Sequence, residues 1–286
     1  MDTFGTYDDY KEHRQVSPSP MTCAHIHDKI KSVMFTVSGN PMYCISGKLV
    51  SVKRFKRSRQ LDITVANSLS YLSCTVDKSE DYIMVWDTSS TLPNVIEEYD
   101  INSVTIGSRL YAISERKIVE CIVQDSHKNY DVSCMTVSST TSIREGTMLF
   151  NVFGDAVGFA IPRNVHKCLV LPIKYVIDYI KSGNLPTSLG LRYHSQYHIT
   201  DVGSSTSVKK FTFIKKCIQQ PSINNTIISR MYDIDGNPIQ IQDIPTLPMS
   251  MIVVVETVNN KGITITTELK TVKFSPYIED NDDFRS

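Results

Sequence analysis

The sequence lacks any apolar run long enough to cross a membrane as a helix, which takes about 18 or more consecutive apolar residues. It also lacks the basic and then apolar opening of a secretory signal, because it begins with the polar, acidic segment MDTFGTYDDYKEHRQ. We therefore expect no membrane span, and we expect the protein to stay in the cytoplasm where it is made.

An excess of either charge is absent too, since 30 basic and 30 acidic side chains cancel. A protein without net charge has no overall electrostatic attraction to nucleic acid or to an anionic membrane, so we do not expect nucleic acid as a partner. With 286 residues, of which 41% are hydrophobic, the chain can bury two cores of ordinary domain size. Partners must therefore be inferred from local sites.

Closely spaced cysteine pairs of the kind that zinc sites use are missing as well. His25 and His27 alternate on a strand-like face near Cys23, but no second cluster supplies further ligands, so we expect neither a metal ion nor a cofactor. An odd, dispersed set of cysteines indicates reduced thiols that are buried as small hydrophobic side chains. The set is Cys23, Cys44, Cys74, Cys121, Cys134, Cys168 and Cys217.

The chain does contain many short runs rich in Val, Ile, Tyr, Thr and Phe, from about Lys29 to residue 162, separated by turn residues. Such spacing is typical of a β-sandwich or barrel. One helix is predicted in LPIKYVIDYIKSG, where apolar residues share one face and Gly183 stops it. After a polar stretch, ITDVGSSTSVKK, a smaller set of strands follows, with turns at 235–238 and 259–262.

The segment EGTMLFNVFGDAVGFAIPRN, followed by LPIKYVIDYI, resembles the end of the protease domain in HtrA-type serine proteases. Upstream, CISGKLVSVKRF is similar to the strand that ends in that family's catalytic histidine, and DYIMVW to the strand that opens with its catalytic aspartate. The resemblance spans about residues 29–275. It implies a mainly β fold, with a trypsin-like double β-barrel followed by a PDZ-like β-rich domain and one connecting helix.

Position by position, the resemblance implies a degenerate catalytic triad. Arg54, or Lys53, stands where the histidine base should be, and a guanidinium cannot accept a proton near neutral pH. Asp81 keeps the acid position, whereas the nucleophile position holds Glu145, or Thr147 if a gap is allowed. The preceding loop also lacks the glycines that an oxyanion hole would need. We therefore expect a protein that is not an enzyme, a pseudoprotease.

Arg54, Asp81 and Glu145 would face one another in this arrangement, and one hypothesis is that they form a charged cluster that holds the two barrels together. A second basic feature is the run Lys53, Arg54, Lys56, Arg57 and Arg59, which is either a solvated loop between strands or a contact for phosphate or an acidic protein.

In the smaller set of strands, Leu189-Gly190-Leu191 follows Ser188 and is similar to the loop whose amides hold a peptide's terminal carboxylate in PDZ domains. The resemblance therefore implies a peptide-binding site at Leu189, Gly190 and Leu191. The alternative is that both leucines are core residues of an edge strand that binds nothing.

These observations predict four parts: a flexible arm at 1–22, a protease-like double barrel at 23–183, a PDZ-like domain at 184–275 and an acidic tail at 276–286. The favoured function is a non-catalytic protein that binds a protein or peptide partner, with a homo-oligomer as one form. The alternative is an active serine or threonine peptidase with rearranged chemistry, for example Thr147 as nucleophile with His166 or His127 as base. A third hypothesis is an assembly component of a virus particle.

Overall fold

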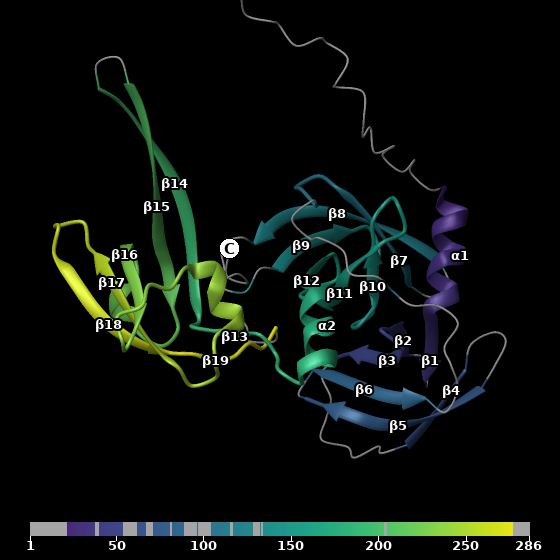
Figure 1. Cartoon of the computed structure of the whole chain (residues 1–286). Coiled ribbons are helices and arrows are strands. Elements are labelled where there is room, and N and C mark those ends of the chain that lie inside the picture. Colours follow the sequence, from purple (N-terminus) through teal and green to yellow (C-terminus); the bar gives the residue numbers. More distant parts are fainter. Residues whose placement is uncertain are drawn as a thin grey trace, which may run out of the picture.

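The computed structural model describes residues 22–37, 40–53, 62–66, 71–80, 82–88, 96, 104–114, 117–127, 132, 134–202 and 205–276. Within these residues the fold is mainly β, which confirms the predicted class. Two closed barrels of six strands each lie together, and an antiparallel sheet of five strands forms a third part beside them (Figure 1).

The first barrel closes in the strand order β1-β2-β3-β6-β5-β4. Its own core is apolar and contains Phe35, Met42, Leu49 and Trp86. The tight turn between its second and third strands lies at Ser46 and Gly47, which both adopt positive φ. Its strands are β1 (Met34–Val37), β2 (Asn40–Ile45), β3 (Lys48–Val52), β4 (Asp62–Ala66), β5 (Tyr71–Ser79) and β6 (Ile83–Thr88).

The second barrel repeats this plan in the order β10-β11-β12-β9-β8-β7. A separate apolar cluster that includes Leu110, Val137 and Val170 fills it. Its strands are β7 (Arg109–Ser114), β8 (Lys117–His127), β9 (Cys134–Ser139), β10 (Met148–Phe150), β11 (Ala156–Pro162) and β12 (Lys167–Pro172). A larger cluster joins residues of both barrels, such as Tyr43 and Val52 of the first with Met148 and Phe159 of the second.

Two α-helices complete the barrel part among the described residues. The predicted helix is α2 (Ile173–Ser182), which buries Ile173, Val176, Ile177 and Ile180 and ends at Gly183 with φ of 76°. The other is α1 (Cys23–Val33), where the sequence pattern predicts a strand-like face at His25 and His27 and strands from about Lys29. That expectation was wrong because Ile26, Ile30 and Val33 follow a helical spacing and are all buried.

The third part begins after α2 and contains strands and two 3₁₀ turns, with no α-helix among its described residues. Its main sheet has the order β14-β15-β16-β17-β18, and the short strands β13 and β19 pair where the chain enters and leaves it. Its core includes Leu189, Leu191, Val253 and Val255. The elements are β13 (Thr187–Ser188), β14 (Leu191–Val202), β15 (Ser205–Cys217), η2 (Pro221–Ile223), β16 (Thr226–Asp233), η3 (Ile241–Thr246), β17 (Ile252–Val258), β18 (Thr264–Lys270) and β19 (Val272–Lys273).

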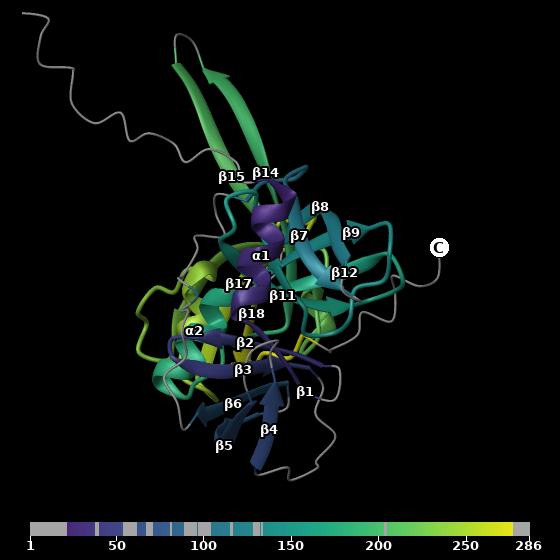
Figure 2. The same ribbon diagram turned by 90° about the vertical axis from the view of Figure 1, so that its right-hand side faces the viewer.

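Strands β14 and β15 form a long hairpin that extends well beyond the sheet in both views (Figures 1 and 2). The polar stretch at 199–210 was expected to interrupt the strand pattern, but 199–202 and 205–210 continue the two strands of this hairpin. The predicted turn at 259–262 is confirmed by the hydrogen bond from the Gly262 amide to the Asn259 carbonyl oxygen.

Candidate functional site

A tight turn at residues 144–147 lies where the resemblance to proteases implies the nucleophile. The Thr147 amide donates to the Arg144 carbonyl oxygen at 3.2 Å, and Gly146 has φ of 77°. Positive φ at the third residue is what a type II turn needs. The turn is fixed to β11 by two further hydrogen bonds, from the Gly146 amide to Ala160 O and from the Ala160 amide to Thr147 O.

Gly146 packs directly against the end of β3. A Cβ atom placed on it would lie 2.2 Å from the carbonyl oxygen of Val52, closer than any real contact. The turn can therefore approach β3 only because residue 146 has no side chain. This close approach brings the segment that carries Glu145 beside the segment that continues to Lys53.

The end of β3 is in turn joined to the start of β6. The Lys53 amide donates to the Tyr82 carbonyl oxygen at 3.0 Å. The three backbone segments that would carry base, acid and nucleophile in a protease therefore meet at one place. Arg54 and Asp81, the predicted base and acid positions next to Lys53 and Tyr82, lie outside the described residues, so the charged cluster stays a prediction.

Glu145 and Thr147 have different environments within the turn. Glu145 is half-buried at the corner, whereas Thr147 is 1% exposed and its backbone is engaged on both sides. Of the two histidines considered as its base, His166 is exposed in the turn after β11, with its Nδ1 3.2 Å from the Ser139 carbonyl oxygen. His127 ends β8, and its side chain lies outside the described residues.

Tyr43 links the two barrels at this place and was not identified from the sequence. Its buried hydroxyl accepts a hydrogen bond from the Met148 amide at 3.0 Å, directly after the turn. Its ring contacts Phe159 edge-on, with ring centroids 5.8 Å apart. Burial raises the pKa of this phenol well above its usual value, so Tyr43 stays neutral. One polar tyrosine within the apolar strand MYCI was the only signal in the sequence.

The second predicted site, at Leu189-Gly190-Leu191, has its loop engaged by the chain itself. Gly190, with φ of 71°, donates its amide to the Ser188 hydroxyl at 2.8 Å. Gln219 donates its side-chain amide to the Leu189 carbonyl oxygen at 2.8 Å, and the Ile218 amide donates to Gly190 O. Both leucines are buried in the core of the sheet, so their side chains serve packing.

The cysteines behave as the composition predicted where they are described. Cys44, Cys74, Cys121, Cys134, Cys168 and Cys217 are free and buried. Burial raises the pKa of Cys44 and Cys168 to about 11 and that of Cys121 to about 12, so these thiols are not reactive thiolates near neutral pH.

The histidines first considered as metal ligands do not share a strand face, because residues 23–33 are helical. His25 is exposed, and His27 is partly buried with Nδ1 3.4 Å from an Asp28 carboxylate oxygen. Among the described residues no three His, Cys, Asp or Glu side chains gather to form a metal site. No described helix is long and apolar enough to span a membrane.

The fold is that of trypsin-like, HtrA-type proteases. The HtrA-type protease AlgW with a tripeptide matches with a TM-score of 0.55 at 10% identity, over 87% of this chain and 98% of that one. An alanine variant of AlgW, also with a tripeptide, gives 0.54 at 9% identity, over 90% and 98% of the two chains. No family model and no curated protein matches the sequence. The likeness therefore shows the fold alone.

Proposed function

We propose that this protein is a non-catalytic scaffold, built on the HtrA-type protease fold, that binds a protein or peptide partner in the cytoplasm. The observation that carries the proposal is the 144–147 turn. Its fixed backbone and the close approach of Gly146 to Val52 favour the alignment that places Glu145, not a hydroxyl, at the nucleophile position. With a carboxylate at that position, and with Lys53 or Arg54 in place of histidine in the aligned sequence, the protein lacks the hydroxyl nucleophile and the imidazole base of a serine protease.

The same features weigh against the alternative peptidase. A nucleophile has to reach a substrate carbonyl, but the Thr147 side chain is buried. The base considered for it, His166, is exposed and interacts with the Ser139 carbonyl oxygen.

Purified full-length protein tests the proposal by incubation with unfolded casein and with a fluorophosphonate probe that labels activated hydroxyls. We expect neither cleaved casein nor labelled protein, with trypsin as the positive control. Cleavage that persists through purification and disappears in Thr147→Val would contradict the proposal and favour the peptidase, since this change removes the hydroxyl and nearly preserves shape.

Partner binding by the PDZ-like part should differ from carboxylate recognition. The Gly190 amide already donates to Ser188 Oγ, so a terminal carboxylate has to displace that bond. In a screen of immobilised peptides, we expect each peptide that binds to have the same affinity whether its C-terminus is a free carboxylate or an amide. We expect Ser188→Ala, which releases the amide, to introduce a preference for the free carboxylate. A strong preference already present in the unaltered protein would contradict this mode of binding.

A further inference from the structure

The β14–β15 hairpin is much longer than the sheet that supports it. Register pairs run along it from Leu191↔Cys217 to Val202↔Ser205, but β15 pairs with β16 only at Thr212, Phe213 and Ile214. In the described part of the chain, the outer segments 195–202 and 205–211 pair only with each other. We call these segments the outer ribbon. At about 3.3 Å per residue its eight-residue first strand measures about 26 Å, and the ribbon projects free of the molecule (Figures 1 and 2).

Such a ribbon has no evident role in the stability of the monomer. A two-stranded hairpin in water is marginally stable by itself. It also exposes apolar surface, since Tyr197 is 66% exposed and Val208 is 59% exposed. A projecting ribbon that displays a large aromatic ring is better explained by contact with another molecule.

Positive charge is concentrated in this hairpin although the chain as a whole is neutral. Residues 191–217 contain five basic side chains and one acidic side chain, Asp201, so the hairpin carries 5 − 1 = +4. The exposed cations Lys209 and Lys210 are neighbours on one strand, so their side chains point to opposite faces of the ribbon. Arg192, Lys215 and Lys216 extend the basic region toward the sheet.

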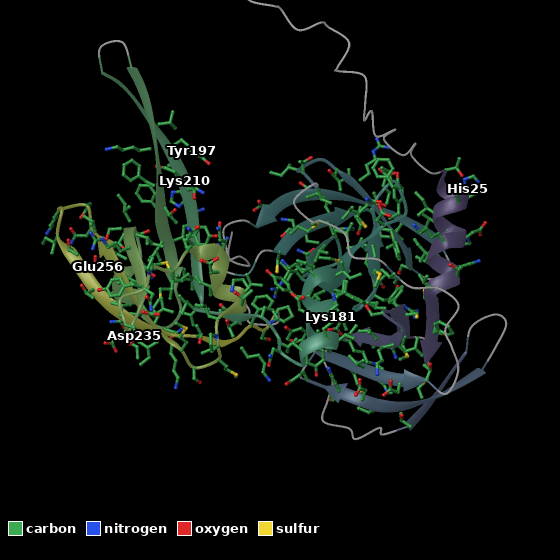
Figure 3. All side chains as sticks on the ribbon, viewed as in Figure 1. His25, Lys181, Tyr197, Lys210, Asp235 and Glu256 are labelled. Atoms are coloured by element: carbon green, nitrogen blue, oxygen red, sulfur yellow. The ribbon has the colours of Figure 1, made fainter. Side chains whose placement is uncertain are left out.

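Aromatic rings lie beside these cations. Tyr197 is directly opposite Lys210 in the register, and both are labelled on the hairpin in Figure 3. Cross-strand partners share a face, so ring and ammonium group are presented together. On the other face, the rings of His194 and Phe213 stack with centroids 5.0 Å apart. Phe211 lies two residues before Phe213 in the same strand, and therefore on the same face.

We propose that the outer ribbon binds single-stranded nucleic acid. Lys210 contacts a phosphate on the face where the exposed ring of Tyr197 stacks on an unpaired base, and Lys209 contacts a phosphate where the nucleic-acid strand passes to the other face of the ribbon. Interleaved cations and aromatic rings are the chemistry of single-strand binding, because every base has a stacking face and every linkage carries a negative charge. An acidic protein would bind the lysines but would offer no base on which the Tyr197 ring could stack. A duplex would bind the lysines too, but its bases are already stacked on one another. The zero net charge of the whole chain conceals this local site.

The charge part of the proposal is tested by fluorescence anisotropy with labelled oligo-dT of about 20 nucleotides and the full chain. We expect Lys209→Glu/Lys210→Glu to weaken binding more than tenfold, and to lower the slope of log K against log salt by about 1.4, since each phosphate contact contributes about 0.7. The matched control is Lys167→Glu/Lys261→Glu, which makes the same charge change at two exposed lysines outside the hairpin. Equal losses in both double variants would overturn the proposal.

The aromatic part is tested with Tyr197→Ala and Tyr197→Phe. We expect the alanine variant to lose about tenfold in affinity for oligo-dT and the phenylalanine variant to lose little, because stacking needs the ring and not the hydroxyl. A duplex of the same length and polyglutamate are expected to bind more weakly and to be indifferent to Tyr197→Ala. Tighter binding of polyglutamate or of the duplex, or unchanged oligo-dT binding in Tyr197→Ala, would overturn the proposal. Circular dichroism of each variant confirms that the sheet is retained.

Discussion

Gly146 lies at the junction between the two barrels, where the 144–147 turn meets the end of β3. Gly146→Ala has to place a Cβ 2.2 Å from the Val52 carbonyl oxygen and keep φ at 77°. We expect it to lower the free energy of unfolding by about 3 kcal/mol or more, because backbone has to move as well as adopt a strained conformation. Urea unfolding followed by circular dichroism measures this loss. Gly47→Ala is the matched control, since Gly47 has φ of 78° but nothing within 4 Å, and it should lose only about 1 kcal/mol. Equal losses would show that the contact with Val52 is unimportant.

Cys121 gives the protein a predictable weakness at alkaline pH. Burial raises the pKa of its thiol from about 9 to about 12. Below about pH 9 the thiol is protonated in both states, and its contribution to stability is complete. As the pH rises from about 9 toward 12, the unfolded chain ionises first, so stability falls by up to about 1.4 kcal/mol per pH unit. In Cys121→Ala the slope of unfolding free energy against pH, measured between about pH 9.5 and 10.5, should be smaller by an amount that corresponds to nearly one proton. An unchanged slope would contradict the buried, neutral thiol.

At the scale of single elements, α2 could be predicted because its signals agree. Its four apolar residues lie on one helical face and Gly183 provides the left-handed ending. In α1 the signals compete, because Val33, Met34 and Phe35 belong to a β-like run that follows the helix without a break. The helix is indicated by the buried face of Ile26, Ile30 and Val33 and by the Thr22 side chain, which accepts from the His25 amide at the helix start.

The candidate site could be predicted only in part for a similar reason. The order of strands carries the approximate positions that the resemblance to proteases assigns to base, acid and nucleophile, so the meeting of these segments could be expected. The contact of Gly146 with Val52 joins residues far apart in the chain, and the same is true of Tyr43 and Met148. No local pattern records such contacts. The strands at 199–202 and 205–210 could not be predicted for another reason. Strands of an exposed ribbon bury neither face, so they need no alternation of apolar and polar residues.

The long hairpin should differ sharply from the strands of the sheet in its local stability. In β17, Val253, Val254 and Val255 are buried and pair with strands on both sides. Within the described residues the outer ribbon pairs only with itself, so its amides need only a local opening to exchange. We expect deuterium uptake by peptides covering 195–211 to be at least about a hundredfold faster than by peptides covering 252–258. Comparable protection of both segments in dilute protein would mean that the ribbon is covered by further contacts.

For the whole molecule, the barrels and the five-stranded sheet have separate cores joined by a few specific contacts. Among the described residues beyond α2, Leu185 and Phe274 pack against the core shared by the barrels as partly buried neighbours. Lys273 Nζ lies 2.5 Å from Glu80 Oε2, and Arg163 donates to the Pro276 carbonyl oxygen at 2.7 Å. The Lys273–Glu80 pair is about one third exposed, so it adds little to stability.

This separation predicts that the barrels fold without the sheet. A protein of residues 22–183 loses the packing of Leu185 and Phe274, worth about 2 kcal/mol for two half-buried apolar side chains. We therefore expect cooperative thermal unfolding with Tm lower by about 4–8 °C, measured by circular dichroism. Phe274→Ala in the full chain is the companion variant and should reproduce part of this shift while the sheet remains. If residues 22–183 show no cooperative transition, the barrels depend on the sheet for folding, and the shared contacts matter far more than their burial indicates.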